Sequence, residues 1–104
     1  MKKFQARHGD LLIEQVDSIP SAAHPVERNG DVILAEGEVT GHAHRIASKA
    51  VSMWSDGAQA YITVDAPADL THEEHRTITI PPGTYKVVRQ REWSLESEWR
   101  QVAD

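Results

Sequence analysis

The sequence predicts an all-β fold, a small barrel or sandwich of about eight short strands in a single domain over residues 1–104. Short apolar or alternating runs recur along the chain, turn-forming residues separate them, and no stretch keeps the 3.6-residue apolar period of a helix. A chain of 104 residues with 39% hydrophobic side chains fits one globular domain with a small core. We expect one or two helical turns at most.

Strands are expected where apolar residues cluster between turn signals. Asp56-Gly57 gives the strongest hairpin signal, because both residues tolerate the positive φ of a tight β-turn. The stretch from Asp17 to Asp31 contains Pro20, Pro25 and Asn29-Gly30, so we expect a long surface loop there. The expected strands cover residues 9–16, 32–36, 39–47, 51–55, 58–64, 77–80, 84–92 and 98–102.

The stretch from Asp65 to His75 is the one place where we expect a helical turn. Thr71-x-x-Glu74 fits a capping box, and Asp69 offers another cap. The stretch is too short to form an independent helix, so any such turn depends on packing against the sheet.

Composition excludes several classes of protein. With no cysteine, the chain has no disulfide, thiolate zinc site, iron–sulfur cluster or cysteine nucleophile. A net charge of −5 argues against a general nucleic-acid binder. No apolar run approaches the roughly 20 residues of a membrane-spanning helix. The basic start is followed by no apolar signal segment, so we expect a cytoplasmic protein.

The six histidines are the most informative feature. His42 and His44 fall in the expected strand 39–47, where residues two apart share a face and can chelate one metal ion. His72 and His75 form a second pair, three residues apart on the expected helical turn. The two pairs suit a divalent ion such as Zn, Fe, Mn or Ni. We therefore expect His42, His44 and His75 to converge, with His72 as the fourth candidate ligand.

Several neighbouring groups are candidates for chemistry at such a site. A carboxylate or imidazole can act as a general base, and a guanidinium suits a carboxylate or phosphate group of a substrate. The candidate catalytic residues are His44, His75, Glu73, Glu74 and Tyr85. The candidate substrate-binding residues are Arg45, Arg89 and Arg91.

Structural interpretations stand beside the functional ones. His42 and His44 can hydrogen-bond within a polar barrel interior, and His72 and His75 can be solvated loop residues. Arg89 and Arg91 can form ion pairs with nearby glutamates. We expect the two remaining histidines, His8 and His24, to be ordinary surface residues.

Four short motifs resemble those of an uncharacterised group of short bacterial and phage-associated proteins. They are A-E-G-E-V-T-G-H-A-H-R (35–45), L-T-H-E-E-H (70–75), P-P-G-T-Y (81–85) and R-Q-R-E-W (89–93), with a closing V-A-D (102–104). The resemblance implies no known activity, but it points to the same histidines.

A second resemblance is to the cupins, small β-barrels that hold a metal ion. Gly37-x4-His42-x-His44 is similar to the start of the first cupin motif, and residues 80–85 are similar to the proline-glycine turn of the second. The cupin glutamate after H-x-H is replaced by Ala47-Ser48-Lys49, and the histidine after the proline-glycine turn is absent. With these departures, the resemblance implies that any metal bound here has a ligand set different from that of cupins.

These observations leave three functions open. The first is a metal-binding protein or metal-dependent enzyme, hydrolase or oxygenase-like, that acts on a small or phosphate-containing substrate. The second is a metal-free, nuclease-like enzyme that uses histidines for acid–base catalysis, with nucleic acid as its less expected partner. The third is a non-enzymatic assembly module, because a small core and three tryptophans favour a homo-oligomer.

Overall fold

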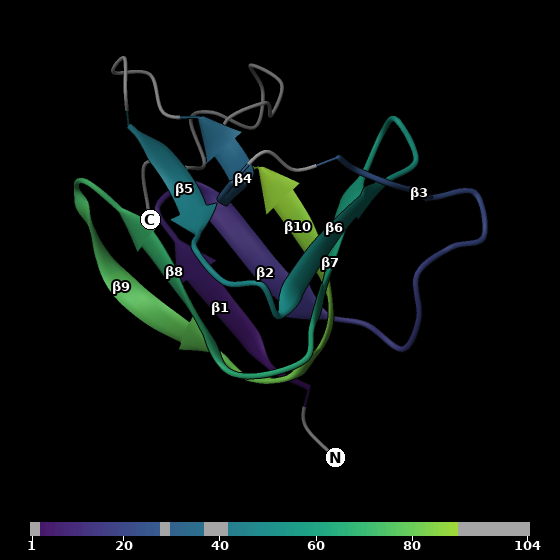
Figure 1. Ribbon diagram of the computed structural model, residues 1–104. Helices are drawn as coiled ribbons and strands as arrows, with labels where there is room; N and C mark the ends of the chain where they lie inside the picture. Colours follow the sequence, from purple (N-terminus) through teal and green to yellow (C-terminus); the bar gives the residue numbers. More distant parts are fainter. Residues whose placement is uncertain (1–2, 28–29, 37–41, 90–104) are drawn as a thin grey trace, which may run out of the picture.

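The computed structural model describes residues 3–27, 30–36 and 42–89, and these contain ten strands and no helix. The strands form two antiparallel sheets that make a sandwich and do not join into a closed barrel (Figure 1). The all-β prediction is confirmed. No helix in the described residues has the length and apolar character needed to cross a membrane.

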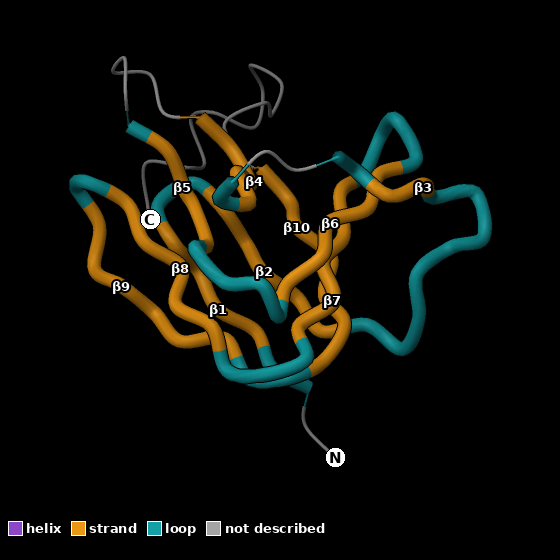
Figure 2. The backbone as a smooth tube through the Cα atoms, in the orientation of Figure 1, coloured by secondary structure: helices purple, strands orange, loops and turns teal. Residues whose placement is uncertain are grey.

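The first sheet has six strands in the order β1-β2-β10-β7-β6-β3. Their bounds are β1 (Gln5–His8), β2 (Leu11–Gln15), β10 (Gly83–Arg89), β7 (Ala60–Val64), β6 (Val51–Ser55) and β3 (His24–Pro25). The expected hairpin at Asp56-Gly57 joins β6 to β7, where Asp56 Oδ1 accepts the N–H groups of Ala58 and Gln59. The loop from β2 to β3 projects from the sandwich (Figure 2).

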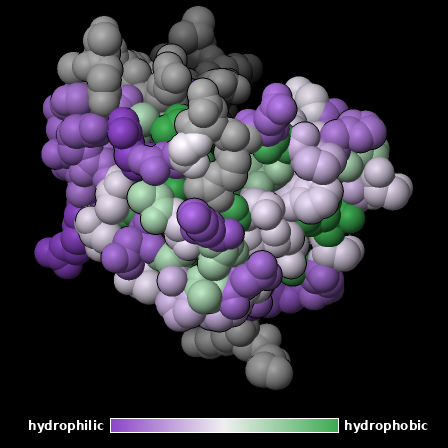
Figure 3. Space-filling view, viewed as in Figure 1, coloured by the Kyte–Doolittle hydropathy of each residue, from purple (hydrophilic) through white to green (hydrophobic). Residues whose placement is uncertain are grey.

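The second sheet has four strands in the order β4-β5-β8-β9. Their bounds are β4 (Val32–Glu36), β5 (Ala43–Ile46), β8 (Ala68–His72) and β9 (His75–Ile80). The sheets contact each other where β1 meets β9 and where β4 meets β6. β9 is mostly exposed, and hydrophilic surface gathers on the side of the molecule where it lies (Figure 3).

Both sheets contribute fully buried apolar side chains to one core. The first sheet supplies Leu11, Ile13, Ile62 and Tyr85, and the second supplies Ile46, Leu70 and Ile80. Burial of these side chains is the main force that holds the two sheets together.

The expected helical turn at residues 65–75 is wrong. Ala68 and Leu70 are buried while Asp69 between them is exposed, which is the two-residue period of a strand. β8 and β9 instead form a hairpin in which His72 pairs with His75 across Glu73 and Glu74.

Other strand boundaries also differ from the prediction. Strand β1 was not expected, and the predicted strand 9–16 begins only at Leu11 because Gly9 and Asp10 form a turn. The predicted surface loop contains the two-residue strand β3. The described part of strand 39–47 is strand only from Ala43 to Ile46. The predicted strand at 98–102 lies outside the described residues.

Candidate functional site

A tight turn between β1 and β2 places the first histidine of the site. His8 pairs with Leu11, which leaves Gly9 and Asp10 as a two-residue loop. Gly9 has φ of 63°, a conformation that favours glycine. A Cβ atom at Gly9 would lie 2.6 Å from His75 Nε2 and 3.0 Å from His44 Cε1. The absence of a side chain here therefore lets the turn approach the histidines of the other sheet.

The second histidine, His44, lies in β5 and is almost fully buried, with 2% of its surface exposed. β5 runs between β4 and β8, and the next residue, Arg45, pairs with Thr71 of β8. Alternate residues of a strand face opposite sides, and His44 turns toward the first sheet, where it meets His8 and Asp10.

The hairpin turn between β8 and β9 supplies two more histidines. His72 is partly buried and His75 is exposed. At the tip, Glu73 Oε1 accepts the N–H of Ala43 at 3.0 Å, and Arg45 Nη2 lies 3.5 Å from Glu73 Oε2. This hydrogen bond from Ala43 is the main cause of the lowered pKa of Glu73. Glu73 therefore fastens the turn to the start of β5.

Four imidazoles meet between these elements, and we call His8, His44, His72 and His75 the histidine cluster. One ring nitrogen from each of His44, His72 and His75 lies within 4.8 Å of the others. His8 Nδ1 lies 2.8 Å from His44 Nδ1. Mutual approach of three or more imidazoles is the arrangement that can hold a transition-metal ion.

A chain of polar contacts surrounds the buried half of the cluster. His8 Nε2–H donates to the backbone carbonyl of Arg76 at 2.8 Å. His44 Nε2–H donates to Asp10 Oδ1 at 3.2 Å, and Arg89 Nε donates to Asp10 Oδ2 at 3.2 Å. Such outer contacts fix which ring nitrogen of a histidine carries the hydrogen.

Burial sets the protonation of this region. Burial, together with the nearby His72 and His8, lowers the pKa of His44 to about 4, and Asp10 offsets only part of this shift. Burial also lowers the pKa of His8, against the hydrogen bond to Arg76. For Asp10, burial would raise the pKa, but the hydrogen bond and charge of Arg89 outweigh it and the pKa is lowered. At neutral pH, Asp10 is therefore a carboxylate beside a neutral His44.

The structure brings together three of the four histidines proposed as ligands. His42 precedes β5, and its ring contacts His72 at a centroid distance of 5.8 Å. Its buried Nδ1 has no hydrogen-bond partner among the described residues, and Glu74 Oε2 lies 3.5 Å away. His42 and Glu74 therefore lie at the edge of the histidine cluster.

The other predicted residues have separate positions. Tyr85 is fully buried in the core and its hydroxyl donates to the carbonyl of Pro81. It lies four residues before Arg89 on β10, or roughly 13 Å along the strand. Arg45 contacts Glu73, and Arg89 contacts Asp10. Arg91 lies outside the described residues.

The expectation that His8 is a surface residue is wrong, since only 3% of it is exposed. Its burial follows from the contact of β1 with β9, which joins residues 68 positions apart. Asp10 was also missed. The one local signal was the Gly9-Asp10 pair, which can form a two-residue hairpin loop between apolar-containing strands. His24 is exposed in β3, as expected.

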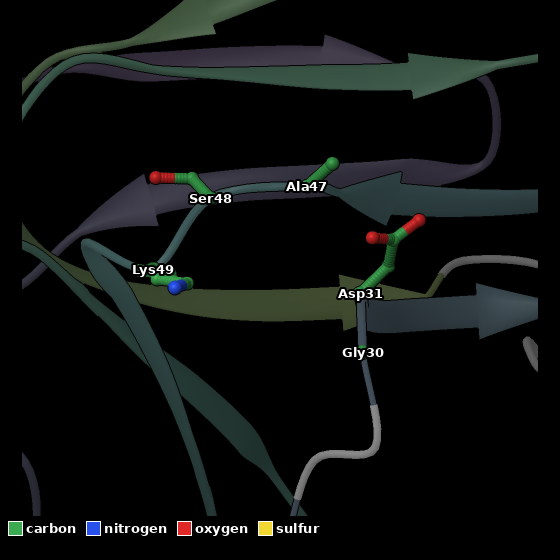
Figure 4. Close-up of a pocket in the computed structure, with 5 residues that line it drawn as sticks. All are labelled: Gly30, Asp31, Ala47, Ser48 and Lys49. Carbon is green, nitrogen blue, oxygen red and sulfur yellow. The ribbon is translucent and has the colours of Figure 1, made fainter.

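A separate pocket of about 560 Å³ lies at the other end of the β4–β5 pair. Gly30, Asp31, Ala47, Ser48 and Lys49 line it (Figure 4). It adjoins the Val32–Ile46 pairing, whereas His44 pairs with Ala35 near the opposite end of the two strands. No histidine lines this pocket, so it is distinct from the histidine cluster.

A family model described as a domain of unknown function (DUF8820) matches residues 7–90 of the chain. This range includes every member of the histidine cluster, together with Asp10 and Arg89. No curated protein and no solved structure matches the chain.

Proposed function

We propose that this chain, which belongs to the DUF8820 family of domains of unknown function, is a metal-binding protein whose site is the histidine cluster. In this proposal the protein binds one divalent transition-metal ion through His44, His72 and His75. The observation that carries it is the approach of their ring nitrogens to within 4.8 Å of one another. The ligands come from three neighbouring strands of one sheet, which supports a site formed by the fold itself.

The chemistry of the donors narrows the choice of ion. Imidazole nitrogens suit Zn, Fe, Ni or Cu, whereas Mn prefers a larger share of oxygen ligands. Glu73 is already bound to the amide of Ala43 and to Arg45, which disfavours it as a ligand or base. Zinc, iron and nickel are therefore better candidates than manganese.

Asp10 has a positioning role in this proposal. Its carboxylate accepts the Nε2 hydrogen of His44, which leaves the Nδ1 lone pair for a ligand. A carboxylate that orients a metal-binding histidine in this way also makes the imidazole a stronger donor. Arg89 in turn holds Asp10 in place and keeps it ionised.

A second candidate function is a metal-dependent hydrolase for a small or phosphate-containing substrate. It is favoured by the position of Glu74, an exposed carboxylate 3.5 Å from His42 at the edge of the cluster. A divalent ion, when bound, would lower the pKa of a coordinated water and polarise a phosphoryl oxygen. Glu74 would accept the proton of that water, with His42 as its neighbour.

The test of metal binding is elemental analysis of protein purified without an immobilised-metal step, followed by titration of the metal-free chain with zinc, nickel or iron(II). We expect one ion per chain and a large loss of affinity in His75→Ala, whose exposed side chain can be removed with little effect on the core. His24→Ala is the matched control, because His24 is also exposed but lies in β3. Equal affinities of all three proteins would contradict the proposal.

The hydrolase proposal has its own test. Zinc-loaded protein is assayed with a nitrophenyl phosphodiester, and Glu74→Gln is compared with the natural chain. A lower kcat at unchanged zinc content would support Glu74 as the base. Absence of turnover by the fully loaded natural chain would leave metal binding intact and contradict hydrolysis of this substrate class.

A further inference from the structure

We infer that His8 is a fourth ligand of the same ion, bound through Nδ1, so that the metal joins the two sheets. The inference rests on the proposed metal site and goes beyond it, because it adds a ligand from the first sheet. It follows from the hydrogen-bond partners of His8 and His44, from the distance between the two rings, and from the arrangement of all four imidazoles.

The contact of His8 with Arg76 fixes the hydrogen of the His8 ring. A backbone carbonyl can only accept a hydrogen bond, so His8 Nε2, 2.8 Å from the carbonyl oxygen of Arg76, carries the hydrogen. In a neutral imidazole the other nitrogen, Nδ1, then has a lone pair and no hydrogen. His8 therefore presents an electron-pair donor to the inside of the cluster.

The same argument applies to His44. The carboxylate of Asp10 accepts a hydrogen bond from Arg89 Nε through its other oxygen, and a carboxylate ion-paired with a guanidinium is an acceptor only. His44 Nε2, 3.2 Å from Asp10 Oδ1, therefore carries the hydrogen, and His44 Nδ1 has the lone pair. In both rings, a partner outside the cluster therefore determines that Nδ1 is the nitrogen with the lone pair.

The two lone pairs face each other, since His8 Nδ1 lies 2.8 Å from His44 Nδ1. Two acceptors at this distance repel each other unless a cation lies between or beside them. Two nitrogens bound to one zinc ion at about 2 Å lie roughly 3 Å apart, close to the observed spacing. A shared metal ion therefore satisfies both nitrogens without changing their outer hydrogen bonds.

The arrangement of the four rings fits the same ion. Four imidazoles placed tetrahedrally, with metal–nitrogen bonds of about 2 Å, have ring centroids roughly 5 Å apart. The six centroid distances within the histidine cluster range from 4.5 to 6.4 Å. The spacing of the four ring centroids is therefore compatible with four ligands of one ion.

This ligand set gives the metal a structural role, and because it leaves no position for a coordinated water it excludes the hydrolase as the second candidate function. His8 comes from β1 of the first sheet, and the other three histidines come from β5, β8 and β9 of the second. Four protein ligands close a tetrahedral zinc site, which is the pattern of structural centres. The ion would fasten β1 to β9, where no backbone ladder joins the two sheets among the described strands. Metal loading would therefore raise the unfolding temperature.

The test combines a variant with a measurement on the natural chain. Zinc affinity is compared between the natural chain, His8→Ala and the exposed control His24→Ala. We expect the zinc affinity of His8→Ala to fall by more than roughly 10–100-fold, which is the typical loss when a residue hydrogen-bonded to a metal ligand is removed. Because His8 is buried, its replacement can impair folding. Long-range ¹H–¹⁵N spectra of the imidazoles in the zinc-loaded natural chain therefore provide a second readout.

The expected spectrum shows His8 with its hydrogen on Nε2 and with Nδ1 shifted to the range of a metal-bound nitrogen. A natural chain that binds zinc while His8 Nδ1 stays in the range of a free or hydrogen-bonded nitrogen would overturn this inference and leave the proposed function standing. The same holds if folded His8→Ala binds zinc as tightly as the control. A natural chain that binds no zinc, nickel or iron(II) would overturn both.

Discussion

The β1–β2 turn and the β8–β9 turn both bring histidines to the cluster, but they differ in how firmly they hold them. In the β1–β2 turn His8 is buried, its Nε2–H donates to the carbonyl of Arg76 at 2.8 Å, and its Nδ1 lies 2.8 Å from His44 Nδ1. In the β8–β9 turn His75 is exposed and His72 is partly buried. The first turn is fixed from both sides, whereas the second faces solvent.

The contact that His72 makes with its own turn shows the same difference. The N–H of Glu74 donates to His72 Nδ1 at 3.0 Å. Metal binding at Nδ1 would use that lone pair, and binding at Nε2 would require the hydrogen to move to Nδ1. Either mode would end the contact, so the proposed metal site requires the outer turn to rearrange. The comparison suggests that the buried side is set in advance and the exposed side closes over the ion.

The largest expected effect comes from replacing His44, whose ring contacts the histidines next to both turns. His44→Ala should lower zinc affinity by more than about 100-fold, because a ligand contributes more than the outer-shell partners that cost 10–100-fold. Isothermal titration against the control His24→Ala checks this, with circular dichroism to confirm the β fold. A folded His44→Ala protein with unchanged affinity would contradict a site centred on this residue.

The pH dependence of stability comes next. The pKa of His44 is lowered in the folded state to about 4 from an ordinary value of 6.5. Between these two pH values the unfolded chain therefore binds a proton that the folded chain does not. The metal-free chain should therefore lose about 3 kcal/mol of unfolding free energy as pH falls from about 7 to 4, at about 1.4 kcal/mol per pH unit. Urea denaturation at several pH values measures this loss, and His44→Ala should reduce it. Stability that rises between pH 7 and 5 would instead indicate a proton held between His8 and His44.

A smaller effect is expected from the outer contacts of the fixed turn. Asp10→Asn removes the charge that orients the Nε2 hydrogen of His44 and should weaken zinc binding by roughly 10- to 100-fold. Asp17→Asn is the control, because Asp17 is an exposed carboxylate whose ion-pair partner is Lys3. Equal affinities of the two variants would exclude a positioning role for Asp10.

The smallest effect tests the close approach of the two turns. Gly9→Ala places a Cβ atom 2.6 Å from His75 Nε2 in a turn whose φ is 63°. Gly57→Ala is a matched control, since Gly57 also has positive φ, of 95°, but no atom lies within 4 Å of its added Cβ. Both should lose about 1–2 kcal/mol of stability from backbone strain, and only Gly9→Ala should also weaken zinc binding. A similar zinc affinity in both variants would show that the turns do not need this contact.

Local sequence patterns were sufficient for much of the fold. The Asp56-Gly57 turn and the alternation of Thr and Ile in residues 77–80 are local signals, and both lie where a hairpin or strand was expected. The prediction of a helical turn at residues 65–75 was wrong because it relied on the capping-box spacing. In the structure, Ala68 and Leu70 are buried with the two-residue period of a strand. That period depends on packing against the other sheet, which a short window does not contain.

The candidate site was predictable only in part. His44 and His72 could be predicted as site residues because each has a second histidine, His42 or His75, two or three residues away in the sequence. His8 has no such neighbour, and its place depends on the contact of β1 with the carbonyl of Arg76, 68 residues away. His42 was expected on the same strand face as His44. Because β5 begins only at Ala43, His42 precedes the strand, and the alternation of side chains along a strand does not determine its direction.

X-ray absorption of the zinc-loaded natural chain tests the central claim most directly, because it counts the ligands of the ion. The account predicts one zinc ion per chain with a first shell of imidazole nitrogens at about 2 Å. A first shell dominated by oxygen, or failure to retain one equivalent of zinc, would contradict it.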